Sequence, residues 1–332
     1  MVGIDYSFAP HMISLHFSLS SWSRLALSVL LWLLGMLTLL SLANSFFFVS
    51  AVLIAFGKYY FWLVLGGLLV SLVVPVAPRT RWVGMVTLGI LLVMVGPYLW
   101  RAVRPQTMAG LRIITLNVSE STEAYDGLIE LINAERADVF FIQELRADLV
   151  ARIEAEVSSD YAYRYFEPSR FTLGLGFVSR LPLENARTVA HEGEGFKRQY
   201  LEVEVTQGGD TYTLLNIHTL PPTRPSWFES RNREIEVYKQ RVTEGSRVIV
   251  AGDFNTVPWS RPVGSREAAY GVSSVESGSA GTWQLFGFPL VRVPLDYALY
   301  SPDLALVETA VLSDIGSDHL PVIVELAPRI GD

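Results

Sequence analysis

The strongest constraint on this chain is a front third with long stretches that carry no charged side chain. These stretches run over 25–57, 59–78 and 82–100 and are 33, 20 and 19 residues long. A helix needs about 20 apolar residues to cross the ~30 Å hydrocarbon core of a bilayer. The second and third stretches therefore predict one membrane span each, whereas the first is too long for one span and too short for two.

These lengths define the expected anchor. We predict spans over about 24–43, 59–77 and 82–100, with an apolar re-entrant or interfacial segment over 45–57. A cleaved signal peptide is the alternative for the first span, because residues 41–43 resemble a small-x-small cleavage site. The two further spans favour a retained anchor. None of the predicted spans contains a carboxylate or a histidine, so the usual residues of a transporter or proton relay are missing.

Charge divides the chain at the same place as hydropathy. Residues 1–110 hold six of the 26 Lys/Arg and one of the 33 Asp/Glu, which gives +5, and residues 111–332 hold the rest, which gives −12. This asymmetry predicts a membrane anchor over 1–105, a linker over 106–110 and a water-compatible domain over 111–332. The absence of cysteine excludes a disulfide scaffold, thiolate chemistry and Cys-ligated zinc.

The water-compatible domain alternates apolar runs with a few amphipathic stretches. This pattern predicts a sheet-rich α/β body of about 220 residues, large enough for one substantial core. We expect strands over 111–118, 138–143, 173–179, 199–205, 211–218, 247–252, 294–300 and 320–326, and helices over 122–134, 145–157 and 226–241.

Polar side chains stand in or at the ends of most predicted strands, where a packed core would exclude them. Burying such groups costs free energy unless they are paired or bind a metal. Taken singly, each has an ordinary explanation as a turn former, a cap or an acid that starts a helix. Six predicted strands that all carry such groups together favour a functional cluster. The residues are Asn117, Gln143, Glu144, Asn216, His218, Asp253, Asn255, Asp296, Asp318 and His319.

The motifs that contain these residues resemble the endonuclease/exonuclease/phosphatase superfamily, which has the deoxyribonuclease I-like fold. The specific signal is GDFN followed about 60 residues later by SDH. In the order typical of that family, the matching stretches are LNV (116–118), DVFFIQE (138–144), LLNIH (214–218), GDFN (252–255), LDYAL (295–299) and SDHLPV (317–322).

The chain is most similar to a membrane-anchored bacterial branch of that superfamily. Both have several N-terminal spans, an HTLPP segment (218–222), a GDFNTxPWS segment (252–260), a Thr-Trp pair (282–283) and a Gly-Ser-Asp-His ending (316–319). One position differs. The branch reads Ile-Asp-His where this chain has Leu295-Asp296-Tyr297, so the acid is kept and its neighbour is changed.

The resemblance implies an α/β (α+β) four-layer αββα sandwich that follows the helical transmembrane region. It also implies a metal-dependent phosphoesterase site at one end of the two sheets. Glu144 is the implied metal ligand, with Asn117 and Asp318 near it. Oxygen ligands of this kind suit Mg²⁺, or Mn²⁺ in its place.

The remaining residues receive catalytic roles from the same resemblance and from the needs of phosphoester hydrolysis. Asp253 is expected to orient and deprotonate the attacking water, and Asn255 to hold the geometry and a phosphate oxygen. His319 is expected to donate to the phosphoryl group while Asp296 fixes its tautomer and charge. His218 is the second imidazole, in contact with the phosphate or the leaving group.

The acidic charge and the anchor together guide the choice of substrate. A domain with a net charge of −12 lacks the positive electrostatic field that attracts nucleic acid. The anchor favours a substrate that already lies in the membrane, namely a phosphorylated lipid or a cell-envelope precursor. The alternatives are an extracytoplasmic nuclease and a non-catalytic membrane scaffold; the latter would not need the six motifs to stay intact. No protein partner is indicated by the sequence.

The location expected from these features is the bacterial plasma (inner) membrane, with several passes. With the N-terminus inside, three basic residues flank each face, so the positive-inside rule gives a tie. The absence of cysteine is compatible with an oxidising compartment, and we expect the catalytic domain outside the cytoplasm.

Four further side chains have several interpretations. His191 lies in a Gly/Glu-rich segment and is expected on a surface loop. Trp227, Trp259 and Trp283 fit a wall beside the site, contact with lipid or core packing equally well.

Overall fold

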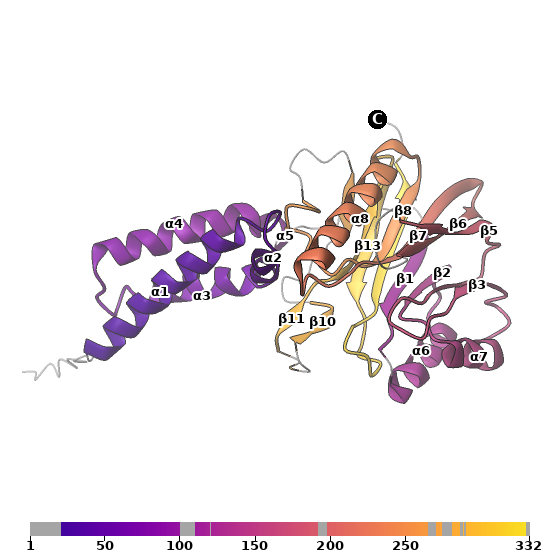
Figure 1. Cartoon of the computed structure of the whole chain (residues 1–332), viewed down its shortest axis with the longest axis horizontal. Coiled ribbons are helices and arrows are strands. Elements are labelled where there is room, and N and C mark those ends of the chain that lie inside the picture. The colour runs from indigo at the N-terminus through magenta and orange to yellow at the C-terminus, as the bar shows by residue number, and fades with distance from the viewer. Residues whose placement is uncertain are drawn as a thin grey trace, which may run out of the picture.

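The computed structural model consists of an N-terminal helical region beside a domain built on two sheets (Figure 1). It describes residues 21–99, 110–119, 121–191, 198–264, 270–273, 281–285, 288 and 290–329. Of the predicted linker, residues 106–109 lie outside this set. The helices of the N-terminal region are α1 (Ser21–Ser41), α2 (Phe48–Ala55), α3 (Gly57–Val70), α4 (Pro78–Met94) and α5 (Gly96–Leu99).

The helix α1 has the length and hydropathy of a membrane span. Among the described residues it is the single helix that qualifies alone, and it lies near the N-terminus, where a signal sequence has the same properties. The helices α2 and α3 are bent by 58° at their junction and qualify only if the pair counts as one span.

The helix bounds differ from the predicted spans where proline and glycine interrupt the chain. The helix α3 ends at Val70, and Pro78 starts α4 because proline is tolerated in the first turn of a helix. The helix α4 ends at Met94, just before Gly96 and Pro97. The first predicted span overlaps α1, and the predicted segment 45–57 contains α2 and the break before α3.

The second part of the molecule contains two six-stranded mixed sheets. The first has the strand order β13-β14-β1-β2-β4-β3 and the second has β5-β6-β7-β8-β12-β9. The first sheet contains β1 (Leu111–Asn117), β2 (Val139–Gln143), β3 (Tyr163–Glu167), β4 (Leu175–Ser179), β13 (Leu304–Val311) and β14 (Val322–Pro328). The second contains β5 (Glu184–Ala190), β6 (Gln199–Gln207), β7 (Asp210–His218), β8 (Val248–Asp253), β9 (Gly271–Ser273) and β12 (Asp296–Tyr300).

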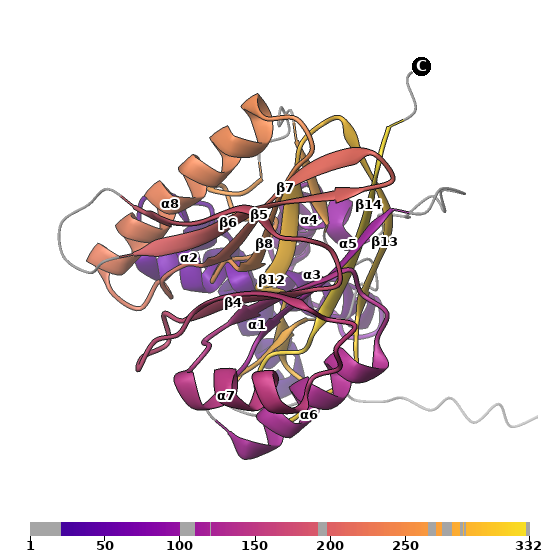
Figure 2. The same cartoon turned by 90° about the vertical axis from the view of Figure 1, so that its right-hand side faces the viewer.

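The sheets and helices form four layers. The inner faces of both sheets meet in a core of aliphatic and aromatic side chains that includes Phe141, Phe177 and Leu214. The helices α6 (Thr122–Ala134) and α7 (Ala147–Glu156) pack on the outer face of the first sheet, and α8 (Pro225–Glu244) packs on the second (Figure 2). The predicted αββα sandwich is therefore confirmed.

His191 lies directly after β5 and outside any strand, as the loop prediction expected, but it is half-buried and not on the open surface. Its Nε2 lies 2.8 Å from the hydroxyl of Tyr238, and its ring packs against Tyr200 and Tyr238. Burial, and secondarily the nearby Arg198, lowers the pKa of His191 from 6.5 to about 4. The Gly/Glu-rich sequence around it concealed this aromatic pocket.

This environment predicts an acid-labile contribution to stability. His191 stays neutral in the folded protein down to a pKa of about 4, whereas it protonates near 6.5 once unfolded. Stability is therefore lost as the pH falls from about 6.5 towards 4. A His191→Phe variant should lose less unfolding free energy than the wild type between these limits, by on the order of 2 kcal/mol. Denaturant unfolding at pH 7 and pH 4.5 measures the difference, and equal pH dependence of both proteins would contradict it.

Candidate active site

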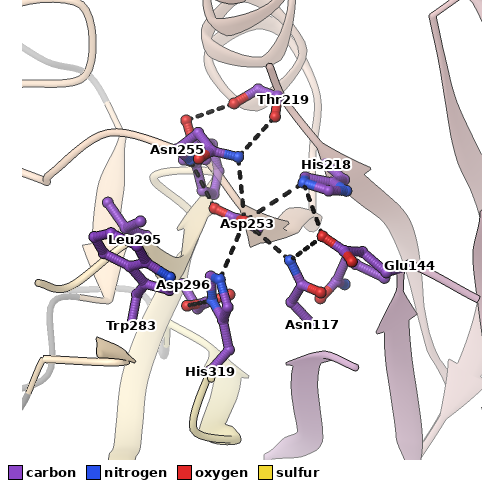
Figure 3. A network of polar contacts seen from close by, with 12 residues as sticks. Asn117, Glu144, His218, Thr219, Asp253, Asn255, Trp283, Leu295, Asp296 and His319 are labelled. Carbon is purple, nitrogen blue, oxygen red and sulfur yellow. Dashed lines mark hydrogen bonds and ion pairs between the residues drawn. The ribbon is translucent and has the colours of Figure 1, made fainter. Parts of the chain in front are cut away.

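The ends of five strands bring the candidate residues together (Figure 3). In the first sheet β1 runs parallel to β2, so Asn117 and Glu144 leave the sheet at the same end. In the second sheet Asp253 on β8 lies beside His218 on β7 and Asp296 on β12. Asn117 Nδ2 donates to Asp253 Oδ2 at 3.2 Å, which joins the two sheets at this point.

The backbone at this end of the sheets is locally unusual. Gly252 has φ 146°, and a Cβ there would lie 1.9 Å from the carbonyl oxygen of Ile217, so only glycine lets β8 approach β7 just before Asp253. Glu144 and Asn255 have φ values of 60° and 46°. Left-handed conformations are costly for such residues, and they cluster at functional sites.

Asp253 is at the centre of the cluster and is 1% exposed. Its Oδ1 accepts the backbone N–H of Asn255 at 2.7 Å, and its Oδ2 also accepts Asn255 Nδ2 at 3.2 Å. Its Oδ2 lies 3.5 Å from His218 Nε2 and 3.8 Å from His319 Nε2. Burial, together with the neighbouring Asp296 carboxylate, raises the pKa of Asp253 to about 7. A carboxylate with such a pKa suits a general base at neutral pH.

His319 and Asp296 form a buried pair. The His319 Nδ1 lies 2.8 Å from Asp296 Oδ2, and both residues are at most 5% exposed. Burial alone would lower the pKa of His319, but the carboxylates of Asp296 and Asp253 outweigh it and raise the pKa to about 10. The imidazole is therefore cationic at neutral pH and can donate a proton or a hydrogen bond.

The second imidazole has the opposite character. Burial, followed by the charges of Arg198 and His319, lowers the pKa of His218 to about 3. Its Nε2 lies 4.0 Å from Glu144 Oε1, which also accepts Asn117 Nδ2 at 3.1 Å. The Glu144 side chain is 18% exposed, so the cluster reaches solvent at this carboxylate. The site thus holds one charged and one neutral imidazole on two sides of Asp253.

Three of the polar residues found in the sequence lie apart from this cluster. Asp318 is exposed, and its Oδ2 accepts Trp283 Nε1 at 3.2 Å instead of joining Asn117 and Glu144. Gln143 and Asn216 are buried between the sheets, where Gln143 Nε2 donates to Asn216 Oδ1 at 2.7 Å. Both residues connect the sheets beneath the site.

Several supporting residues were missed by the sequence analysis. Thr282 Oγ1 accepts the backbone N–H of Asp296 at 3.1 Å, and Ser317 Oγ donates to the carbonyl of Asn117 while accepting the N–H of His319. Arg231 on α8 is fully buried and donates to the carbonyl of Asn255 at 3.0 Å. Ser317 and Thr282 stand in the Ser-Asp-His and Thr-Trp motifs, which gave no role for either residue. Nothing in the sequence around Arg231 marks it as a buried support of the site.

Two sets of side chains offer ligands for a metal ion. The donor atoms of Asp253, Asp296 and His319 all lie within 4.8 Å of one another and could hold an ion. The raised pKa of His319 and its contact with Asp296 favour a protonated ring, which cannot ligate. Among the described residues, the buried Oδ1 of Asn117 has no hydrogen-bond partner, and its amide lies beside the Glu144 carboxylate. These two oxygens fit a hard cation such as Mg²⁺ better.

Two stacked mixed sheets with amides, acids and paired imidazoles at one end define a phosphoesterase of the deoxyribonuclease I-like class. Residues 114–319 match the Endonuclease/Exonuclease/phosphatase family, and the chain belongs to that family. Its members are metal-dependent hydrolases that act on phosphoester bonds. No curated protein sequence matches the chain.

Solved structures with the same fold are distant in sequence. A humanized TDP2 from D. rerio is 20% identical with a TM-score of 0.56, over 66% of this chain and 100% of that one. An endonuclease/exonuclease/phosphatase from Beutenbergia cavernae is 20% identical with a TM-score of 0.54, over 67% of this chain and 72% of that one. The 3′ phosphatase NExo from Neisseria is 16% identical with a TM-score of 0.50, over 65% and 99%. These similarities establish the fold alone.

Proposed function

We propose that this protein is a membrane-anchored, metal-dependent phosphoesterase. It hydrolyses a phosphate ester or diphosphate, and its substrate is a phosphorylated lipid or a cell-envelope precursor. The observation that carries the catalytic part is the convergence of Asn117, His218 and His319 on the buried carboxylate of Asp253. Glu144 joins this cluster through Asn117 and His218. A buried, mutually paired cluster of acids and imidazoles at the strand ends is typical of a functional site.

The polar groups divide the work of hydrolysis between them. Asp253 takes the proton of the attacking water, because its raised pKa lets it accept a proton near neutral pH. Cationic His319 donates to a phosphoryl oxygen, and Asp296 keeps it charged and fixes its ring. Neutral His218 lies on the other side of Asp253, where it can form a hydrogen bond with the leaving oxygen.

The amide side chains orient these groups. Asn255 Nδ2 donates to Asp253 and to the carbonyl of Thr219. These two bonds fix the orientation of its amide, whose oxygen can accept a hydrogen bond from water. Asn117 and Glu144 would hold Mg²⁺ or Mn²⁺, which supplies charge neutralisation at the phosphate oxygens. Asp318 can join them only if its contact with Trp283 is exchanged.

The membrane part of the proposal has its own support. The helix α1 is apolar enough to span a bilayer, and the domain behind it carries −12 of charge, which disfavours binding to the polyanionic backbone of nucleic acid. The helical region also packs directly against segments beside two catalytic strands, including Val257, which follows β8, and Leu295, which precedes β12. A substrate that already lies in the membrane would therefore reach the site from nearby.

A substrate panel tests this function on the full chain in detergent or nanodiscs with Mg²⁺. We expect hydrolysis of bis-p-nitrophenyl phosphate or p-nitrophenyl phosphate, higher kcat/KM on a polyprenyl diphosphate or phospholipid, and loss of all turnover with a chelator until Mg²⁺ or Mn²⁺ is restored. Cutting of plasmid DNA in preference to every lipid would assign a nuclease instead. No turnover of any substrate would support the scaffold interpretation.

We further propose a multi-pass inner-membrane location with the catalytic domain outside the cytoplasm. C-terminal fusions distinguish the two orientations, because alkaline phosphatase is active only outside and a fluorescent reporter that matures only in the cytoplasm gives the opposite result. Activity of the phosphatase fusion is the expected outcome.

A further inference from the structure

The helical region makes polar contacts with the two chain segments that carry the catalytic residues. Trp259 Nε1 donates to the carbonyl of Ile54 at 2.8 Å, and the backbone N–H of Arg261 donates to Asn44 Oδ1 at 2.8 Å. Both contacts lie in the loop that begins at Asp253. These contacts connect the helices to the loop that follows Asp253.

The second segment leads from Arg292 to Asp296, and one tyrosine of the helical region forms hydrogen bonds with it. The Tyr59 hydroxyl on α3 accepts the N–H of Arg292 at 2.7 Å and donates to the carbonyl of the same residue at 2.9 Å. It therefore satisfies both backbone groups of one residue in β11 (Arg292–Val293), as a neighbouring strand would.

This tyrosine is connected to the catalytic histidine through a short ladder of strands. The strand β11 pairs with β10 (Trp283–Gln284), and Trp283 forms an isolated bridge with His319. On the two sides of that bridge, the N–H of Gln284 donates to the carbonyl of Asp318 at 3.0 Å and the N–H of Leu320 donates to the carbonyl of Thr282 at 2.7 Å. The position of β11 fixes β10, and β10 fixes the backbone of His319. A shift of β11 therefore moves the backbone that carries His319.

Apolar packing closes the same junction. Trp259 and Leu295 belong to one buried cluster with Ile54 and Phe61 of the helical region. A Cβ on Gly57 would lie 3.1 Å from the indole nitrogen of Trp259, so the helix break between α2 and α3 is fitted closely to this ring. Leu295 directly precedes Asp296, and Trp259 follows Asp253 by six positions.

We propose that the helical region positions part of the active site. Tyr59 sets the position of His319 through the paired strands β11 and β10. This inference rests on the proposed phosphoesterase function and goes beyond it, because the helices then do more than locate the enzyme at a membrane. Tyr59 touches neither substrate nor reacting atoms and is a positioning residue.

The test replaces Tyr59 by phenylalanine in the full chain. The Tyr59→Phe variant keeps the ring and leaves the N–H and carbonyl of Arg292 without their partner. We expect kcat on bis-p-nitrophenyl phosphate to fall about 10- to 100-fold with KM nearly unchanged, since small misplacements of a catalytic group have effects of this size. The matched control is Tyr60→Phe on the adjacent buried tyrosine, which should keep wild-type kcat.

Hydrogen exchange supplies a readout that does not depend on turnover. In Tyr59→Phe the amides of Gln284 and Leu320 should exchange about tenfold faster, while those of β1 and β2 keep their rates. Wild-type kcat and exchange in Tyr59→Phe, from an active wild-type protein, would overturn the positioning role. A wild-type protein without turnover whose Tyr59→Phe variant still shows the faster exchange would overturn the phosphoesterase function and leave the ladder intact.

Discussion

Replacing Asp253 by asparagine is expected to lower kcat by about 10³- to 10⁴-fold on any phosphoester that the protein hydrolyses, which is the range for losing a general base. The side chain keeps its shape but can no longer accept the proton of water. It also loses one of the acceptors that serve the amides of Asn117 and Asn255, at a cost of about 1–3 kcal/mol. Removing a buried acid next to Asp296 offsets part of that cost. Steady-state kinetics and thermal unfolding on the same preparation measure both effects.

A second acid provides the control for Asp253→Asn. Asp138 stands just before β2, at the end of that strand opposite to Glu144, and accepts the N–H of Arg112 and the amide of Gln207. Asp138→Asn should lower stability by about 1 kcal/mol and leave kcat within about twofold of wild type. Similar kcat losses in both variants would show that Asp253 acts through folding and not through chemistry.

The sequence predicted the central strands and the convergence of most site residues. Strands such as β2 and β8 are continuous apolar runs that end in a polar residue, so both the strand and its functional end are visible in one segment. The resemblance to the endonuclease/exonuclease/phosphatase superfamily then implied that these ends meet. The structure brings seven of the eight predicted residues into one cluster: Asn117, Glu144, His218, Asp253, Asn255, Asp296 and His319. Their chemical roles stay predictions.

The exception, Asp318, shows why side-chain direction was beyond the sequence. It follows buried Ser317 and precedes buried His319, so its own side chain turns outwards to Trp283. Alternation along an extended segment predicts this turn, but only once the direction of His319 is known. Strands β5 and β13 were missed because they lack a continuous buried apolar run: β5 is mostly exposed and polar, and most of β13 is half-buried with Glu308 in its middle.

The contacts between the helical region and the domain were also invisible in the sequence. The bond between Tyr59 and Arg292 joins residues 233 positions apart, and nothing in either neighbourhood marks the pair. Trp259 had three equally plausible environments, and the structure places it in the junction between helices and catalytic loop. Pairings over such distances depend on how two separately folded parts meet, which local patterns do not encode.

The second large effect is expected from Asp296→Asn, which should lower kcat by about 10²- to 10⁴-fold. Without the carboxylate, the His319 ring loses the contact that fixes its orientation and the charge that keeps it protonated. The pair also has a defined pH dependence. Because the folded pKa of His319 is raised to about 10, its stabilisation is complete below about pH 6.5 and is lost as the pH rises towards 10. The stability deficit of Asp296→Asn should therefore be larger at pH 6 than at pH 9. Thermal unfolding at the two pH values, in one detergent, measures it.

A double-variant cycle decides whether Asp296 acts through His319 or by itself. If the carboxylate works only by orienting and charging the imidazole, His319→Gln alone already removes the catalytic benefit of both residues. The combined Asp296→Asn and His319→Gln protein should then have nearly the kcat of His319→Gln, and the two single losses should not multiply. Multiplying losses would mean that Asp296 has an independent role, such as holding an ion together with Asp253. In that case the affinity for Mg²⁺, measured by titrating activity, would fall in Asp296→Asn and not in His319→Gln.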